Sequence, residues 1–192
     1  MYTELPHDQI ELALDWILQL AEDQLHITSL AIPMKKQCLE PIRPKRINDK
    51  RFVSLSLTKL KEIVLFDLKN CYYVLGNVVL RQRKGIPMGS PLSPVLAMLI
   101  CMFYEHKFIN TPRNHGCVQV HGSRYVDDLL AVLVCPVHTS DDTIHHVWNS
   151  QVSCLYHSDM RLENEDFDAS FDFLDATIVP SDTSFVSFLK NF

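Results

Sequence analysis

The sequence lacks the long apolar segment that a membrane-spanning helix requires. Its longest apolar run, from Pro94 to Tyr104, is far shorter than the roughly 20 residues that cross a bilayer. The N-terminal residues also lack the charged start, apolar middle and small-residue cleavage site of a signal peptide. These absences predict a soluble, intracellular chain.

The sequence also has no Cys-x-x-Cys motif, no internal repeat and no low-complexity tract. Its six cysteines stand singly, which in an intracellular chain is typical of reduced, half-buried thiols. His115, Cys117 and His121 are conceivable zinc ligands, but a fourth is missing and the segment has a strand pattern, so a zinc site is disfavoured. Apolar residues are 47% and charged residues 21% of the 192 residues. This composition argues against disorder, collagen and coiled coil, and the length allows one domain or a fragment of a larger protein.

The net charge of −5, from 18 basic and 23 acidic residues, argues against a nucleic-acid-binding surface. The charges are nevertheless segregated, because basic residues dominate between Lys35 and Arg51 and acidic residues dominate between Asp159 and Asp175. Two interpretations remain open. In the first, both segments are solvated loops. In the second, the basic strip contacts phosphates through residues such as Arg43, Lys45 and Arg46.

Helices are expected in four places. Pro6 suits a first helical turn, and apolar residues follow it at helical spacing. Ser140, followed by two acidic residues, is a good start for the last helix. The expected helices cover residues 6–24 and 57–69, a segment that follows Pro94 and ends near residue 108, and residues 140–157.

Strands are expected mainly as local hairpins, one over residues 71–82 around the turn pair Gly76-Asn77 and one over residues 118–135. Two further strands are expected near residues 160–165 and 171–179. Prolines among the charges of residues 33–51 predict a loop or insertion. The order of elements predicts an α+β fold, with helices packed on one face of an antiparallel sheet.

Asp127 and Asp128 interrupt the apolar second hairpin. Two adjacent carboxylates are costly inside a strand, so they are expected at a tight turn that directs both away from the sheet. The plain interpretation is a simple Asp-Asp turn. The functional one is a carboxylate platform for Mg²⁺, which prefers oxygen ligands and, as a pair of ions, supports phosphoryl transfer.

The loop from Gln82 to Pro94 contains two glycines and three prolines, which fix an unusual backbone path and allow a close approach to the main chain. It leads into an apolar helix whose N-terminal N–H groups suit an anion. A structural connector is the plain interpretation of this loop, which we call the Gly/Pro loop.

Together the two segments resemble reverse transcriptases. Residues 81–94, Arg-Gln-Arg-Lys-Gly-Ile-Pro-Met-Gly-Ser-Pro-Leu-Ser-Pro, resemble motif B, and residues 124–130, Arg-Tyr-Val-Asp-Asp-Leu-Leu, resemble the Tyr-x-Asp-Asp hairpin of motif C. The sequence of the first segment is most similar to that of Penelope-like retroelement enzymes. Phe173-Leu174-Asp175 resembles the segment that these enzymes carry downstream of motif C. The resemblance covers about residues 70–180 and implies the palm of a right-hand polymerase.

The N-terminus, Met1-Tyr2-Thr3-Glu4-Leu5-Pro6, resembles the tail of motif A. In that register the first catalytic Asp would lie four residues before Met1. The resemblance therefore implies a palm core over residues 1–180 that is truncated within motif A, with fingers and thumb largely missing and a C-terminal tail over residues 181–192. Such a chain is expected to be inactive on its own.

The resemblance also implies roles for individual residues. Asp127 and Asp128 correspond to metal ligands for two Mg²⁺ ions, with Mn²⁺ as a substitute. Tyr125 corresponds to the aromatic residue near the primer end, and Tyr2 to the residue under the nucleotide sugar. Four residues of the Gly/Pro loop correspond to the wall around the nucleotide and template base, namely Gly85, Pro87, Met88 and Gly89. Gln82 and Lys84 are looser candidates for contacts with the template or the triphosphate.

The activity that the resemblance implies is RNA-directed DNA polymerisation, the transfer of a nucleotide from a deoxynucleoside triphosphate to a primer 3′-OH. The expected partners are a primed RNA or DNA template and deoxynucleotides, without a membrane, and the nucleus is the expected compartment. The alternative is a catalytically dead palm-fold remnant that serves as a nucleic-acid-binding or assembly module.

Overall fold

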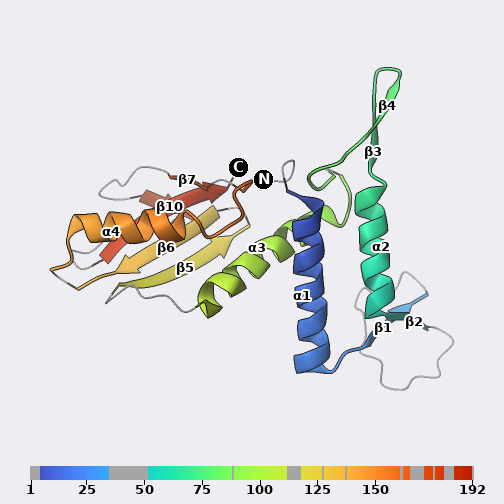
Figure 1. Cartoon of the computed structure of the whole chain (residues 1–192), viewed down its shortest axis with the longest axis horizontal. Coiled ribbons are helices and arrows are strands. Elements are labelled where there is room, and N and C mark those ends of the chain that lie inside the picture. The colour runs from blue at the N-terminus through green and yellow to red at the C-terminus, as the bar shows by residue number, and fades with distance from the viewer. Residues whose placement is uncertain are drawn as a thin grey trace. The chain divides into compact units, whose positions relative to one another are not determined.

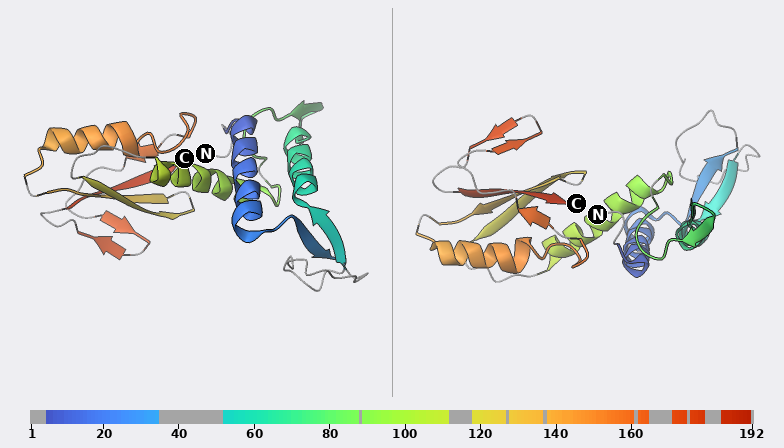
Figure 2. Two further views of the ribbon diagram at one scale, coloured as in Figure 1. Left: turned by 60° about the horizontal axis from the view of Figure 1, so that its bottom comes forward. Right: turned by 90° about the horizontal axis from the view of Figure 1, so that it is seen from above.

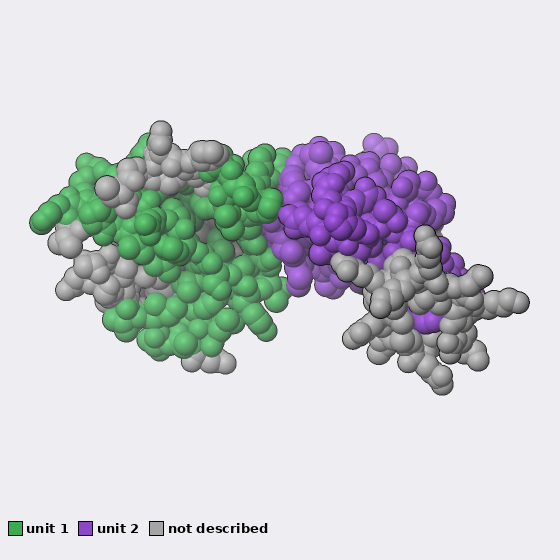
Figure 3. All heavy atoms as spheres, turned by 90° about the horizontal axis from the view of Figure 1, so that it is seen from below, with its two compact units in different colours: residues 1, 104–192 green, residues 2–103 purple. Residues whose placement is uncertain are grey.

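The computed structural model describes residues 5–34, 52–87, 89–111, 118–126, 128–136, 138–160, 162–164, 171–174, 176–179 and 184–191. These residues form four α-helices, one short π-helix and four small antiparallel sheets (Figure 1). The mixed α+β class predicted from the sequence is confirmed. The chain divides into two compact units (Figure 3). We call residues 2–103, purple and labelled unit 2 in the figure, the first unit, and residue 1 with residues 104–192, green and labelled unit 1, the second unit.

The first unit contains two helices that the sequence predicts to within one residue. Helix α1, His7–Leu25, follows the extended Pro6 and ends where His26 adopts a left-handed φ of 52°. Helix α2, Leu57–Lys69, begins after Ser56, whose hydroxyl accepts a hydrogen bond from the Lys59 backbone N–H. This side-chain cap satisfies one of the donors that a helix start leaves unpaired.

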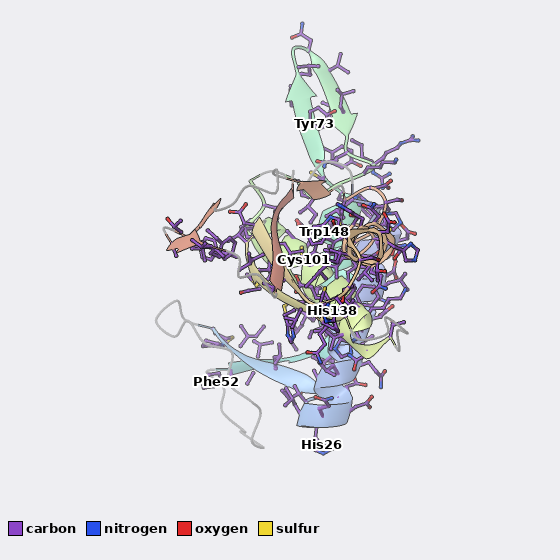
Figure 4. All side chains as sticks on the ribbon, turned by 90° about the vertical axis from the view of Figure 1, so that its left-hand side faces the viewer. His26, Phe52, Tyr73, Cys101, His138 and Trp148 are labelled. Atoms are coloured by element: carbon purple, nitrogen blue, oxygen red, sulfur yellow. The ribbon has the colours of Figure 1, made fainter. Side chains whose placement is uncertain are left out.

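The first unit also contains two ribbons. Strands β3, Tyr72–Leu75, and β4, Val78–Arg81, form the hairpin that the sequence predicts, and Tyr73 lies on it (Figure 4). Strands β1, Ser29–Pro33, and β2, Phe52–Ser56, form a ribbon that the sequence analysis missed. They pair across an intervening segment of 18 residues, and such a distant pairing leaves no local turn pattern.

The second unit is built on a four-stranded sheet of order β5-β6-β10-β7. Its strands are β5, Gln119–Tyr125; β6, Asp128–Val134; β10, Ser184–Asn191; and β7, Leu162–Asn164. Alternate residues of β6 are buried, namely Leu129, Ala131 and Leu133. This period of two places one face of the hairpin in the core.

Helix α3, Ser93–Asn110, and helix α4, Asp141–Val147, carry the remaining helical residues. Helix α4 lies along one face of the sheet (Figure 2). The prediction of a helix to residue 157 is wrong, because α4 passes into the π-helix η1, Trp148–Val152, and turns follow. The wider π-turn places Trp148 and Val152 in the core, where both side chains are buried.

Three further expectations are corrected. The sequence predicted essentially one sheet, whereas β1–β2, β3–β4 and β8–β9 pair as separate ribbons within the described residues. The strand expected over 171–179 is a hairpin, β8 Phe171–Phe173 and β9 Ala176–Ile178, because Leu174 takes a left-handed φ of 51°. The segment expected as a tail contains β10, which pairs with β6 along its length. In the described part of the chain, no helix is long and apolar enough to span a membrane.

Candidate active site

The second hairpin ends in a two-residue connection. Tyr125, the last residue of β5, is the cross-strand partner of Asp128, the first residue of β6. Between them Val126 has a φ of 55°, a left-handed conformation that is rare for a β-branched residue. Asp128 therefore belongs to the strand rather than to the turn, which corrects the prediction for this residue. Asp127 lies outside the described residues.

Asp128 has a buried oxygen that lacks a partner. Its Oδ1 is shielded from solvent and makes no hydrogen bond within the described part of the chain. Buried carboxylate oxygens are normally paired, because an unpaired charge loses its hydration without compensation. A hard cation that prefers oxygen ligands would provide the missing interaction, so Asp128 fits a Mg²⁺ ligand. Among the described residues alone, no group of three or more His, Cys, Asp or Glu side chains could hold a metal ion.

A polar cluster of Glu105, Arg124 and Tyr156 lies behind this hairpin. Arg124 Nε donates to Glu105 Oε1, and Arg124 Nη2 lies 3.4 Å from Glu105 Oε2. The Tyr156 hydroxyl donates to the same Oε1 at 2.7 Å, and Arg124 Nη1 donates to the Val126 carbonyl oxygen at 2.8 Å. No pattern in the sequence indicated a role for these three residues. Glu105 is 19 residues from Arg124 and 51 residues from Tyr156 along the chain, so no local spacing could have indicated the cluster.

The Gly/Pro loop lies in the first unit and is held by the N-terminal residues. Gly85 N donates to the Leu5 carbonyl oxygen at 2.7 Å, and His7 Nε2 lies 2.9 Å from the Gly85 carbonyl oxygen. Gly85 and Gly89 have φ values of 77° and 97°, so the expectation that glycine permits this backbone path is confirmed.

The rest of the loop is held by two further polar contacts. Ser93 Oγ donates to the Pro87 carbonyl oxygen, and Ser90 Oγ donates to Asp67 Oδ2 at 3.1 Å. Pro87 and the neighbouring Ile86 are buried, whereas Gly89 is exposed. The loop therefore combines a fixed, buried half with an accessible half.

The two looser candidates in this loop differ in accessibility. Gln82 is half-buried, and its Nε2 donates to the Lys84 carbonyl oxygen at 2.8 Å. The Lys84 residue itself is exposed. Cys71 Sγ donates to Gln82 Oε1 at 3.7 Å. Burial and the nearby Asp67 carboxylate raise the pKa of the Cys71 thiol.

The candidate residues fall into two groups. Gly85, Pro87 and Gly89 share one loop of the first unit, and Tyr125 and Asp128 share one hairpin end of the second. Tyr125 is 56% exposed and so is accessible to a ligand. The candidates that lie outside the described residues, besides Asp127, are Tyr2, Met88, Arg43, Lys45 and Arg46, as are the conceivable zinc ligands His115 and Cys117.

Comparisons with protein-family models, with curated proteins and with solved structures find no match to this chain.

Proposed function

We propose that this chain is the palm core of a reverse transcriptase, a nucleotidyltransferase of retroelement origin. The proposal depends above all on the buried Oδ1 of Asp128, which has no hydrogen-bond partner among the described residues. Asp128 is the cross-strand partner of Tyr125 at the end of a Tyr-Val-Asp-Asp hairpin. An isolated Asp-Asp turn has no reason to bury a carboxylate oxygen without a partner. A cation ligand has such a reason.

The chain's own residues would divide the work of nucleotide transfer. Asp127 and Asp128 would hold Mg²⁺, which neutralises charge on the reacting phosphate oxygens when bound. By the resemblance to motif B, the Gly/Pro loop would contribute nucleotide contacts, with the exposed Lys84 side chain as a candidate for the triphosphate. The primer 3′-OH attacks the α-phosphorus of the deoxynucleotide, and the bond to the leaving pyrophosphate breaks. Positioning and charge neutralisation, rather than covalent help from side chains, dominate such a transfer.

The metal role is tested directly on this chain with Mn²⁺, whose paramagnetism broadens nearby amide NMR signals. We expect Mn²⁺ to broaden the signals of residues at the β5–β6 end first. Asp128→Asn should weaken Mn²⁺ binding by about tenfold, because carboxylate charge sets the affinity of such sites. The matched control is Asp23→Asn on the exposed surface of α1, which should leave binding unchanged. If Mn²⁺ broadens the same signals equally in the native chain and in Asp128→Asn, the proposal is contradicted.

Catalysis is tested in a polypeptide that adds an upstream segment carrying the Asp of the motif A register. We expect Mg²⁺-dependent primer extension that Asp128→Asn removes. Retroelement polymerases act where chromosomal DNA is, so a nuclear location belongs to the same proposal.

A non-catalytic nucleic-acid-binding module is the second candidate, and the β3–β4 hairpin favours it. Tyr72 and Tyr73 are exposed there, and Arg81, Arg83 and Lys84 are exposed beside them. Exposed aromatic rings next to basic side chains are typical of single-strand binding, in which bases stack on the rings. Binding of a fluorescent oligonucleotide that depends on Tyr72 and Tyr73, but neither on Mg²⁺ nor on Asp128, would favour this candidate.

A further inference from the structure

The turn between β5 and β6, just before Asp128, is strained. Val126 holds a φ of 55°, in which its branched Cβ crowds the backbone. A residue stays in such a conformation only when its surroundings determine it, and strain of this kind concentrates at functional sites. The contacts of the Val126 backbone therefore identify the group that maintains the turn.

Arg124 makes that contact. Its Nη1 donates to the Val126 carbonyl oxygen at 2.8 Å, while its Nε and Nη2 face the two oxygens of Glu105. A planar guanidinium makes these bonds together because its donors form a rigid fork. The Arg124 side chain is only 11% exposed and that of Glu105 25%, so the pair is largely withdrawn from solvent.

Glu105 is itself fixed from a third element. The hydroxyl of Tyr156, a buried residue after η1, donates to Glu105 Oε1 at 2.7 Å. The Tyr156 ring also packs edge-on against Tyr104, with ring centroids 6.5 Å apart. The chain of contacts thus runs from the segment after η1, through α3, to the end of β5.

Among the described residues, the cluster contacts the backbone of the turn through the Val126 carbonyl oxygen. The cross-strand partner of Arg124 is the buried Leu129, so both side chains lie on the core face of the hairpin. Asp128, one residue before Leu129, lies on the other face because side chains alternate along a strand. Arg124 and Asp128 therefore lie on opposite faces of the hairpin.

We infer that Arg124 is a positioning residue for the Asp-Asp pair, held by Glu105 and Tyr156. It keeps Val126 in its left-handed conformation and so sets the direction in which the chain enters β6 at Asp128. The importance of this geometry for a cation rests on the proposed function. The effect on the turn does not.

The first measurement is therefore independent of metal. In the 192-residue chain, the HN–Hα scalar coupling of Val126 reports its φ, and amide hydrogen exchange at residue 128 reports opening of the turn. Arg124→Lys keeps the charge but loses the fork, so we expect Val126 to leave its left-handed conformation and exchange at residue 128 to accelerate. Glu105→Gln should act in the same direction, and Tyr156→Phe more weakly. Arg81→Lys, which alters an exposed arginine on β4, is the matched control.

Val126→Gly separates positioning from general stability. Glycine adopts the left-handed conformation without steric cost, so the turn should no longer depend on Arg124. In the Val126→Gly background, Arg124→Lys should change exchange at residue 128 far less than it does in the native chain. If Arg124→Lys changes exchange at residue 128 equally in both backgrounds, the cluster stabilises the fold by general packing and does not position the turn. If Arg124→Lys does not fold, Glu105→Gln in the two backgrounds provides the same comparison.

The second measurement is Mn²⁺ affinity in the same variants. Arg124→Lys should weaken it by about tenfold, the lower end of the loss typical when a group that orients a metal ligand is changed. A disturbed turn with unchanged Mn²⁺ affinity would overturn the positioning role, as would an undisturbed turn in both Arg124→Lys and Glu105→Gln. A native chain that does not bind Mn²⁺, with a turn that still depends on Arg124, would leave the role of Arg124 in the turn standing and overturn the proposed function.

Discussion

His7 Nε2 lies 2.9 Å from the carbonyl oxygen of Gly85, 78 residues further along the chain. The Gly85 N–H in turn donates to the Leu5 carbonyl oxygen at 2.7 Å. Both hydrogen-bonding groups of one glycine are thus satisfied by the residues that precede and begin α1. The path of the Gly/Pro loop is therefore set by a long-range contact as well as by its own glycines.

Gly85→Ala should destabilise the chain by about 1–2 kcal/mol, because an alanine at a φ of 77° is strained. Urea unfolding of the native chain and the variant measures the difference. The control is Gly122→Ala in β5, where an added Cβ would lie 3.5 Å from the Leu130 carbonyl oxygen, an ordinary contact. A Gly85→Ala variant as stable as Gly122→Ala would contradict this account of the loop.

Lys61 should make a pH-dependent contribution to the packing of α2 on α1. Its Nζ lies 2.6 Å from Asp15 Oδ1 and 3.3 Å from Glu11 Oε1, and the hydrogen bond to Asp15 is the main cause that raises the pKa of Lys61 above its usual 10.5. A raised folded-state pKa stabilises the fold below the unfolded-state pKa, and this stabilisation is lost as the pH rises through the folded-state value. The contribution is small because the side chains are partly exposed.

The measurement is the difference in unfolding free energy between the native chain and Lys61→Gln across the alkaline range. We expect a constant difference at neutral pH that shrinks above about pH 10.5, where the lysine begins to lose its proton. A difference that persists unchanged at the highest pH would assign the effect to packing of the lysine stem instead.

The described cysteines should differ in reactivity. Burial raises the pKa of Cys135, and burial together with Asp67 raises that of Cys71, so both remain protonated thiols at neutral pH. Because the thiolate is the nucleophile, both should react with iodoacetamide more slowly than the exposed Cys154. Peptide mass spectrometry of partially labelled protein gives the three rates. Asp67→Asn should accelerate Cys71 alone, and equal acceleration of Cys135 would point to general loosening.

The β3–β4 hairpin should promote self-association. Val74 and Val79 are cross-strand partners and are 70% and 66% exposed, and Leu75 and Val78 beside them are exposed as well. An exposed apolar ribbon with unpaired strand edges is a site for association with other chains. Sedimentation velocity should show a concentration-dependent increase in mass that Val74→Lys with Val79→Glu removes, since opposite charges across the ribbon also preserve the hairpin. Ile109→Lys, at an isolated exposed position on α3, should leave the association unchanged.

Local patterns in the sequence were enough for the elements that depend on neighbouring residues. The stripe of Leu57, Val64 and Leu68 buries one face of α2, and Gly76-Asn77 closes the β3–β4 hairpin where the sequence predicts it. Glycines at Gly85 and Gly89 were expected to permit an unusual path, and both φ values are left-handed. In each case the physical cause, a helical repeat or a backbone conformation that favours glycine, acts within a few residues.

Contacts between distant residues required the tertiary structure. The pairing of β10 with β6 joins residues 50 to 62 positions apart, and the Glu105–Arg124–Tyr156 cluster joins three separate parts of the chain. The same holds for Asp128, whose place as the first residue of β6 and whose buried Oδ1 come from its pairing with Tyr125 and from the packing around the hairpin. The sequence by itself determined which carboxylates interrupt the apolar hairpin. Only the tertiary structure decided which of their oxygens is withdrawn from water, because burial depends on what the rest of the chain places nearby.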